Sequence, residues 1–124
     1  MPCSSVSVLR KLGIDLGYMH DAEPCCGSPM YYAGFESEYA AHARKNYEIF
    51  KSLGIRKIIG LVPGCTSALK NVYPKYVKGY DLEVRHVLEV IADRLKESGI
   101  RPMAKEKVQV VYHDPCQMSR YLQL

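Results

Sequence analysis

Cysteine is the residue type that gives this chain most of its chemical potential. The chain holds five cysteines in 124 residues. Four of them lie in short segments that contain glycine or proline and that follow apolar runs. Cys25 and Cys26 are adjacent and precede Gly27, Cys65 ends a Val-Pro-Gly-Cys segment, and Cys116 ends a His-Asp-Pro-Cys segment. This pattern favours a metal or cluster site over cysteines that only fill a core.

Thiolates are preferred ligands of iron–sulfur clusters and of structural zinc. The spacing alone does not choose between them, because the chain has neither paired Cys-x-x-Cys knuckles nor a four-cysteine ferredoxin run. A redox-active vicinal pair and a structural loop are the other interpretations of Cys25 and Cys26. His113 can bind a metal or bond to the local backbone. Cys3 is interpreted as incidental.

The remaining histidines, His20, His42 and His86, stand outside the cysteine segments and are interpreted as surface residues. The ten tyrosines mostly fall at apolar positions of the expected helices and strands, and so suit core or subunit contacts.

The composition indicates one soluble domain. A mass of 14.0 kDa with 48% hydrophobic residues suffices for a single core. The net charge of +4 comes from basic residues spread along the chain, which does not favour nucleic acid as a partner. No stretch approaches the roughly 20 apolar residues of a membrane span, and no signal peptide begins the chain. We therefore expect a cytoplasmic protein without an integral membrane span, whose odd number of cysteines argues against a secreted disulfide framework.

Hydrophobic periodicity predicts the elements that position the cysteines. Three- and four-residue spacing predicts helices over residues 5–12, 36–53, 66–72 and 82–95. Continuous or β-branched apolar runs predict strands over residues 15–19, 57–62 and 108–112. Two prolines and a glycine predict a loop over residues 23–29, which contains the vicinal pair.

The alternation of helix and apolar strand predicts an α/β fold, with a Rossmann-like parallel sheet and flanking helices. In such sheets, functional groups gather on the loops beyond the carboxyl ends of the strands. Cys25, Cys26, Cys65 and Cys116 each follow a predicted strand. We therefore expect these four cysteines to share one edge of the sheet.

The same segments resemble the cysteine-rich CCG domain found in the B and D subunits of heterodisulfide reductase, and in the iron–sulfur subunits that serve glycolate, lactate and anaerobic glycerol-3-phosphate oxidation. The resemblance extends in order over nearly the whole chain. It rests on Glu-Pro-Cys-Cys-Gly-Ser-Pro at 23–29, Gly34, Asn46, Pro-Gly-Cys at 63–65, Tyr73-Pro74 and His-Asp-Pro-Cys at 113–116.

The resemblance implies a [4Fe-4S] type of cluster with Cys25, Cys26 and Cys65 among its ligands. Cys116 then resembles the first cysteine of a second copy of the motif. Two departures accompany these matches: Val62 stands where the family has the first cysteine of Cys-x-x-Cys, and the family's early cysteine would fall upstream of Met1. On this reading, residues 1–124 are a single CCG-type α/β domain, and a fragment that lacks an upstream strand and a downstream second motif.

The function expected from the resemblance is that of an iron–sulfur electron-transfer component of an oxidoreductase. Its partners would be flavin or ferredoxin-like subunits, with a disulfide, a quinone or another electron acceptor, and it could lie at a membrane complex through these partners. The alternative is a structural or docking domain built around zinc, with Cys25, Cys26, Cys65 and Cys116 or His113 as ligands. A third possibility is an α/β fragment that binds no metal.

Overall fold

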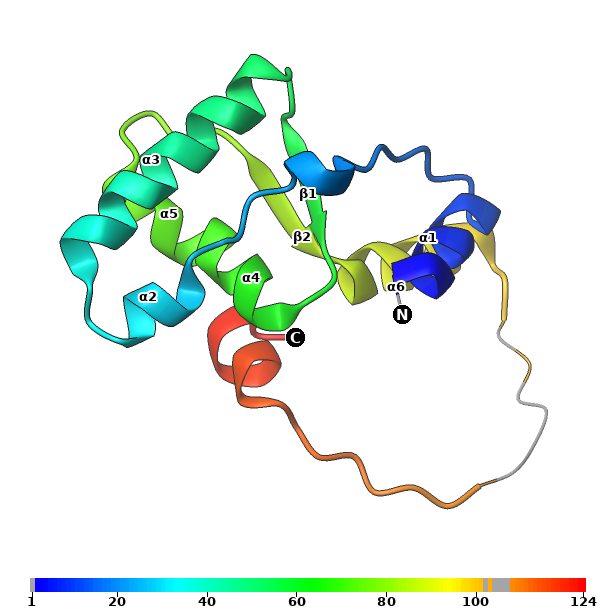
Figure 1. Ribbon diagram of the computed structural model, residues 1–124. Helices are drawn as coiled ribbons and strands as arrows, with labels where there is room; N and C mark the ends of the chain where they lie inside the picture. Colours follow the sequence, from blue (N-terminus) through cyan, green and yellow to red (C-terminus); the bar gives the residue numbers. More distant parts are fainter. Residues whose placement is uncertain (1, 102, 104–107) are drawn as a thin grey trace.

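The computed structural model of the chain describes residues 2–101, 103 and 108–124. Its elements run from a first helix near the N-terminus to a helical turn near the C-terminus (Figure 1). In chain order they are α1 (Pro2–Lys11), a 3₁₀ turn (His20–Ala22), α2 (Ser28–Tyr32), α3 (Glu36–Ser52), β1 (Lys57–Gly60), α4 (Pro63–Ser67), a π-helical segment (Ala68–Val72), α5 (Tyr73–Tyr76), β2 (Glu83–His86), α6 (Val87–Ser98) and a second π-helical segment (Gln117–Leu122).

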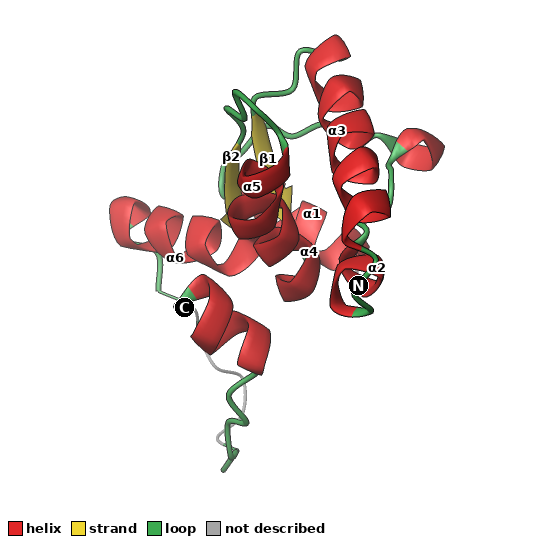
Figure 2. Cartoon of the chain, turned by 90° about the vertical axis from the view of Figure 1, so that its left-hand side faces the viewer, coloured by secondary structure: helices red, strands yellow, loops and turns green. Residues whose placement is uncertain are grey.

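The sheet consists of two parallel strands, β1 and β2, among the residues that the structure describes. Lys57 pairs with Glu83 at one end of the ladder and Gly60 with His86 at the other. Helix α3 flanks the sheet on one side, while α4 and the segment Ala68–Val72 pack against the strands (Figure 2). The α/β class and the parallel pairing are therefore as predicted, and so are the helix over residues 36–53 and a strand that begins at Lys57.

The predicted helix over residues 82–95 is wrong at its beginning, because β2 occupies Glu83–His86. Burial there alternates with a period of two: Val84 and His86 are buried, and Glu83 is exposed. The helix α6 then starts at Val87. Its first turn is held by a capping box, in which the His86 side chain accepts from Leu88 N at 3.3 Å and the Glu89 carboxylate accepts from His86 N at 2.7 Å.

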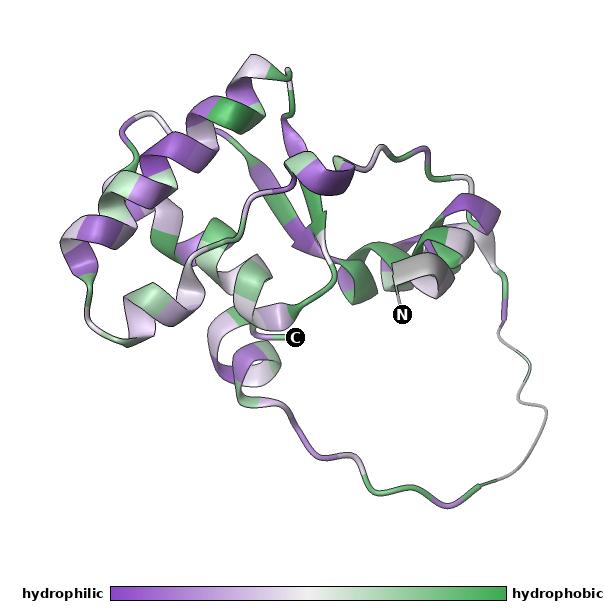
Figure 3. Ribbon diagram, in the orientation of Figure 1, coloured by the Kyte–Doolittle hydropathy of each residue, from purple (hydrophilic) through white to green (hydrophobic). Residues whose placement is uncertain are grey.

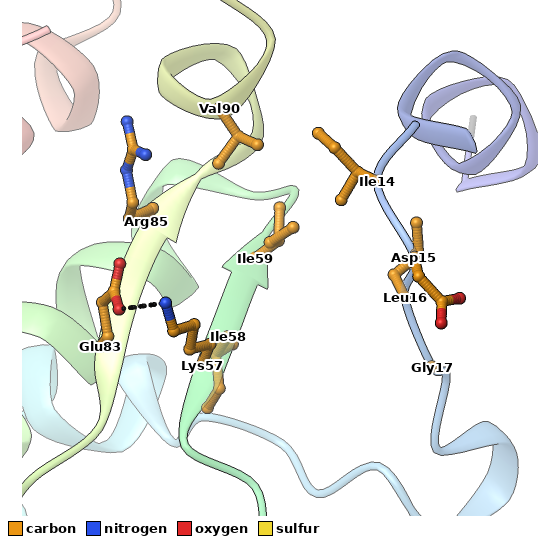
Figure 4. Close-up of a pocket in the computed structure, with 10 residues that line it drawn as sticks. All are labelled: Ile14, Asp15, Leu16, Gly17, Lys57, Ile58, Ile59, Glu83, Arg85 and Val90. Atoms are coloured by element: carbon orange, nitrogen blue, oxygen red, sulfur yellow. Dashed lines mark ion pairs between the residues drawn. The ribbon is translucent and has the colours of Figure 1, made fainter. Parts of the chain in front are cut away.

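The predicted strands over residues 15–19 and 108–112 are wrong. Residues 14–17 run beside the outer edge of β1, but a cavity of about 410 Å³ separates the two, and no ladder forms across it (Figure 4). Residues 108–112 form an exposed, mostly apolar segment without regular secondary structure, with Val111 98% exposed (Figure 3). β-branched residues favour extended backbone, but a strand also needs a neighbour that accepts its hydrogen bonds.

The core lies between α3 and the helical stretch from α4 to α5. Helix α3 buries one stripe of side chains at three- and four-residue spacing, namely Tyr39, Ala43, Asn46, Tyr47 and Phe50. Tyrosine rings dominate the contact: Tyr39 and Tyr73 meet edge to face with centroids 6.0 Å apart, and Tyr73 and Tyr80 do so at 6.2 Å. The expectation that tyrosines suit core contacts is confirmed for Tyr39, Tyr47 and Tyr73, whereas four others are exposed, namely Tyr18, Tyr32, Tyr112 and Tyr121.

A π-helical register between α4 and α5 sets the direction of Tyr73. Tyr73 N donates to Ala68 O, five residues back. In that register the next carbonyl, Leu69 O, faces position 74, which is a proline and has no amide hydrogen. The Tyr80 hydroxyl donates to Leu69 O instead, at 2.6 Å. An irregular helix at a proline thus keeps its carbonyl paired, as a buried backbone requires.

The end of β1 and the start of α4 approach each other closely. Thr66 is fully buried, and its hydroxyl donates to Val62 O at 2.9 Å. A Cβ atom on Gly60 would overlap Thr66 Oγ1 and lie 3.0 Å from Thr66 Cβ. Gly60 is therefore required by this contact, because the Thr66 side chain has no room to move.

We expect Gly60→Ala to lower the free energy of unfolding by about 1–3 kcal/mol, because the added methyl group overpacks the contact with Thr66. Gly64→Ala is the matched control, since a Cβ there meets nothing within 4 Å. The control should change stability by less than about 1 kcal/mol. Urea denaturation of both variants measures the difference, and equal losses would contradict the contact.

The tyrosine core also predicts alkaline instability. Burial is the main cause that raises the pKa of Tyr73 to about 12, and burial likewise raises the pKa of Tyr39 and of Tyr80. The unfolded chain therefore releases these protons first. The stability that these three protonated tyrosines contribute is fully present below their pKa of about 10 in the unfolded chain. It is lost as the pH rises through their pKa values in the folded chain.

The free energy of unfolding, followed by urea denaturation from about pH 9 to about pH 12, should fall steadily. Tyr80→Phe removes one of the titrating groups and should reduce the slope. A flat profile over this range would contradict the assignment.

Candidate metal centre at the vicinal cysteines

The vicinal cysteines lie on a loop whose shape depends on the glycine that follows them. Gly27 adopts a left-handed backbone, with φ of 75°, and precedes α2. A Cβ on Gly27 would lie 2.8 Å from His42 Cδ2 and 3.3 Å from the Tyr39 ring. Only glycine meets both demands. The predicted loop is confirmed through Gly27, whereas Ser28 and Pro29 already form the first turn of α2.

The loop brings Cys26 against Cys65, which is 39 residues later in the chain. Their Sγ atoms are 3.0 Å apart, and Cys26 Sγ also lies 3.4 Å from Ser28 Oγ. The Ser28 hydroxyl donates to Gly64 O at 3.3 Å, which ties the start of α2 to the start of α4. Cys26 is buried, Cys65 is half-buried and Cys25 is exposed. All three line one open cavity of about 990 Å³.

The other residues of interest lie elsewhere. Cys116 and His113 are exposed and do not line this cavity. Cys116 directly precedes the second π-helical segment, which packs against α4. Val62 is 57% exposed and also stands outside the cavity lining. In the described part of the chain, the structure therefore brings together Cys25, Cys26 and Cys65, and leaves Cys116 and His113 apart from them.

The three thiols suit a thiolate-ligated group in their chemistry, but they are not a complete ligand set. Among the described residues, no three Cys, His, Asp or Glu side chains converge closely enough to hold a metal ion by themselves. A tetrahedral zinc site or an iron–sulfur cluster needs about four ligands. Cys26 and Cys65 already touch, whereas Cys25 shares only the cavity.

Burial keeps the Cys65 thiol protonated in the absence of a cation. Burial, and next the hydrogen bond that the protonated Cys65 thiol shares with Cys26, raise the pKa of Cys65 to about 12, and electrostatic interaction with the Cys26 and Cys25 side chains acts in the same direction. A bound metal cation reverses this balance, because coordination stabilises the thiolate. Metal binding here must therefore release protons.

Three side chains hold the backbone carbonyls of the two cysteines. Asn46 Nδ2 donates to Cys25 O at 2.7 Å and to the Tyr73 hydroxyl at 2.8 Å. The Tyr73 hydroxyl in turn donates to Cys26 O at 3.2 Å. The third side chain, His42, has its Nε2 atom 2.7 Å from Cys25 O. We call Asn46, Tyr73 and His42 the carbonyl clamp.

Counting donors assigns the His42 tautomer. The Asn46 amide has two N–H groups, and both are used by Cys25 O and Tyr73 Oη. The 3.1 Å approach of Asn46 Nδ2 to His42 Nε2 is therefore not a hydrogen bond. Since a carbonyl only accepts, His42 Nε2 carries the proton that it donates to Cys25 O. Both lone pairs of that carbonyl are then satisfied.

Sequence reasoning missed the clamp as a functional group. His42 was expected at the surface but is half-buried against the cysteine loop, and His86 is only 3% exposed rather than a surface residue. His20 is exposed, as expected. One signal was present: Asn46 is a polar residue inside the apolar stripe of α3, and His42 precedes it by one helical turn.

Comparison with known proteins identifies the family of the chain. Residues 2–70 match the family CCG, described as a cysteine-rich domain. The chain belongs to this family of cysteine-rich domains.

Its relatives are much longer proteins. The chain is 35% identical over 116 residues to the EtfAB:quinone oxidoreductase of Syntrophomonas wolfei, a match that covers 94% of this chain and 16% of that protein. It is 33% identical over 124 residues to the D subunit of the dihydromethanophenazine:CoB–CoM heterodisulfide reductase of Methanosarcina mazei, covering 96% of this chain and 30% of that one. It is 34% identical over 113 residues to the B subunit of the fumarate reductase (CoM/CoB) of Methanothermobacter marburgensis, covering 91% and 22%.

The chain thus spans less than a third of the length of each of these relatives. No solved structure matches it. Within the described residues, no helix has both the length and the apolar character needed to cross a membrane.

The clamp predicts opposite outcomes for two tyrosines that are equally buried. We expect Tyr73→Phe to lower the free energy of unfolding by about 1–3 kcal/mol, because it leaves an Asn46 N–H and Cys26 O unpaired. We expect Tyr39→Phe to be neutral or stabilising by up to about 1 kcal/mol, because the buried Tyr39 hydroxyl has no hydrogen-bond partner among the described residues.

Chemical denaturation measures both variants, and the rate at which iodoacetamide alkylates Cys26 gives a second readout. Tyr73→Phe should speed that alkylation by loosening the loop, whereas Tyr39→Phe should leave it unchanged. Equal behaviour of the two variants would contradict the clamp.

Proposed function

We propose that this chain is the cysteine-rich part of an iron–sulfur oxidoreductase, and that Cys25, Cys26 and Cys65 are ligands of a [4Fe-4S] type of cluster. The observation that carries the proposal is the contact between Cys26 and Cys65, which joins the cysteine loop to α4 at a cavity that Cys25 also lines. Membership of the CCG family and the iron–sulfur names of several relatives support it. Such a cluster supplies one-electron transfer when it is bound.

The chain's own residues would bind and orient this group. The carbonyl clamp fixes the backbone carbonyls of Cys25 and Cys26, so the backbone positions from which their thiols project are defined. The fully buried Tyr73 ring and the half-buried Cys65 limit water on the inner side of the cavity. Because Cys25 is exposed, the outer side is open to a partner. Three thiols leave part of the ligand set to be filled from outside the described residues.

Cys116 is not assigned to this site, because it is exposed and does not line the cavity. Its predicted place in a second motif concerns a different site and stays a prediction, as does the domain organisation. We further propose that β1 and β2 belong to a Rossmann-like sheet with the Cys65 segment at the carboxyl end of β1. The short connection from Gly60 to α4, which carries Cys65, supports this arrangement.

The partners proposed are a flavin or ferredoxin-like subunit on one side and a disulfide, a quinone or another acceptor on the other. The names of the relatives support this, since they include a quinone oxidoreductase and a component of a heterodisulfide reductase. We place the protein in the cytoplasm, at a membrane complex where its partners require it. Zinc is the second candidate: Val62 stands where the family motif has a cysteine, and a zinc ion needs only four ligands in all.

The test is anaerobic purification of the natural protein, including any segments that flank these 124 residues. We expect iron, sulfide and broad visible absorption. Cys26→Ser and Cys65→Ser should each remove most of the iron bound at this site, whereas Cys116→Ser, the matched control, should retain it. A colourless protein with one zinc would support the second candidate, and a protein that binds neither metal would refute both.

A further inference from the structure

The two cysteines in contact are suited to a second kind of chemistry. The Sγ atoms of Cys26 and Cys65 are 3.0 Å apart, only about 1 Å more than a disulfide bond of about 2.05 Å. No other pair of cysteine sulfurs approaches in this way among the residues that the structure describes. The residues come from different segments, the cysteine loop and α4, so a bond between them would link the two walls of the cavity.

We propose that Cys26 and Cys65 form a reversible disulfide when the metal is absent, and that this bond closes the site to metal. The geometry selects this pair over Cys25 and Cys26. Adjacent residues joined by a trans peptide have Cα atoms about 3.8 Å apart, which is below the usual range of about 4.4–6.8 Å for disulfides. Cys25 Sγ is instead 3.5 Å from Gly27 N, within its own loop.

The oxidant is a low-molecular-weight disulfide, R–S–S–R. One cysteine thiolate attacks a sulfur of this molecule and displaces the first R–S⁻, which leaves a mixed disulfide on the protein. The second cysteine then attacks the protein sulfur of the mixed disulfide and displaces the second R–S⁻. The two protein thiols lose two electrons and two protons, and the oxidant leaves as two molecules of R–SH.

The consequence for metal binding rests on the proposed function. A disulfide sulfur does not serve as a thiolate ligand, so the bond removes two of the three thiols and leaves only Cys25. The metal-free site would thus be protected from irreversible oxidation of its thiols until a reductant opens it. The inference that the disulfide forms depends only on the distance between the sulfur atoms of Cys26 and Cys65, and not on the proposed function.

The experiment treats the intact chain, stripped of metal by a chelator, with glutathione disulfide and maps the product by mass spectrometry. Trypsin leaves Cys25 and Cys26 together on residues 12–44 and Cys65 on residues 58–70. We expect a cross-link between these two peptides, reversed by dithiothreitol. The oxidised protein should also melt at a higher temperature than the reduced protein, because the bond closes a long loop.

Two variants identify the partner within the first peptide. Cys25→Ser should retain the cross-link and Cys26→Ser should abolish it. A bond inside residues 12–44, a cross-link that survives Cys26→Ser, or the absence of any cross-link would each overturn the proposal.

Reconstitution with iron and sulfide, before and after reduction, separates this inference from the proposed function. If the cross-link forms but the reduced protein takes up no iron, the disulfide stands and the proposed function fails. If the reduced protein takes up iron but Cys26 and Cys65 never cross-link, the disulfide fails and the proposed function stands. Equal iron uptake by the oxidised and the reduced protein would refute the claim that the disulfide prevents metal binding.

Discussion

The amide of Asn46 is the interaction on which the rest of the site depends. It is nearly fully buried in α3, and its two N–H groups reach the Cys25 carbonyl and the Tyr73 hydroxyl. A buried amide must pair its hydrogens or lose stability, so α3, the cysteine loop and α5 have to meet at one point. The cysteine loop has little regular structure of its own. The hydrogen bond from Asn46 fixes its backbone, as the hydrogen bonds of a helix or strand would otherwise do.

The irregular helix after β1 is part of the same constraint. The π-helical register and Pro74 interrupt the regular helical hydrogen bonds at the point where Tyr73 enters the core. Tyr80 compensates by pairing with Leu69 O. The tyrosines therefore do two kinds of work: their rings fill the space that α3 leaves, and their hydroxyls satisfy carbonyls that irregular backbone would leave unpaired.

The sequence predicted those parts of the fold that depend on local pattern. The long stripe of α3 and the apolar run at Lys57 could be recognised because each is periodic or continuous over its whole length. Residues 82–86 were misassigned because their apolar positions also fit the helical spacing of α6, and residues 108–112 because β-propensity does not reveal whether a neighbouring strand exists. The expectation that Cys26 and Cys65 lie near each other came from a topology whose strand over residues 15–19 is absent from the described residues. The roles of His42 and Tyr73 depend on long-range contacts that no local pattern encodes.

At Val62 the backbone and the side chain have separate roles. Its carbonyl accepts from both Thr66 N and Thr66 Oγ1 at 2.9 Å, and so the backbone at this position is needed by α4, while its side chain is mostly exposed. The Val62 side chain therefore contributes little to the stability of the fold. A different side chain at this position would therefore leave the backbone contact that begins α4 in place.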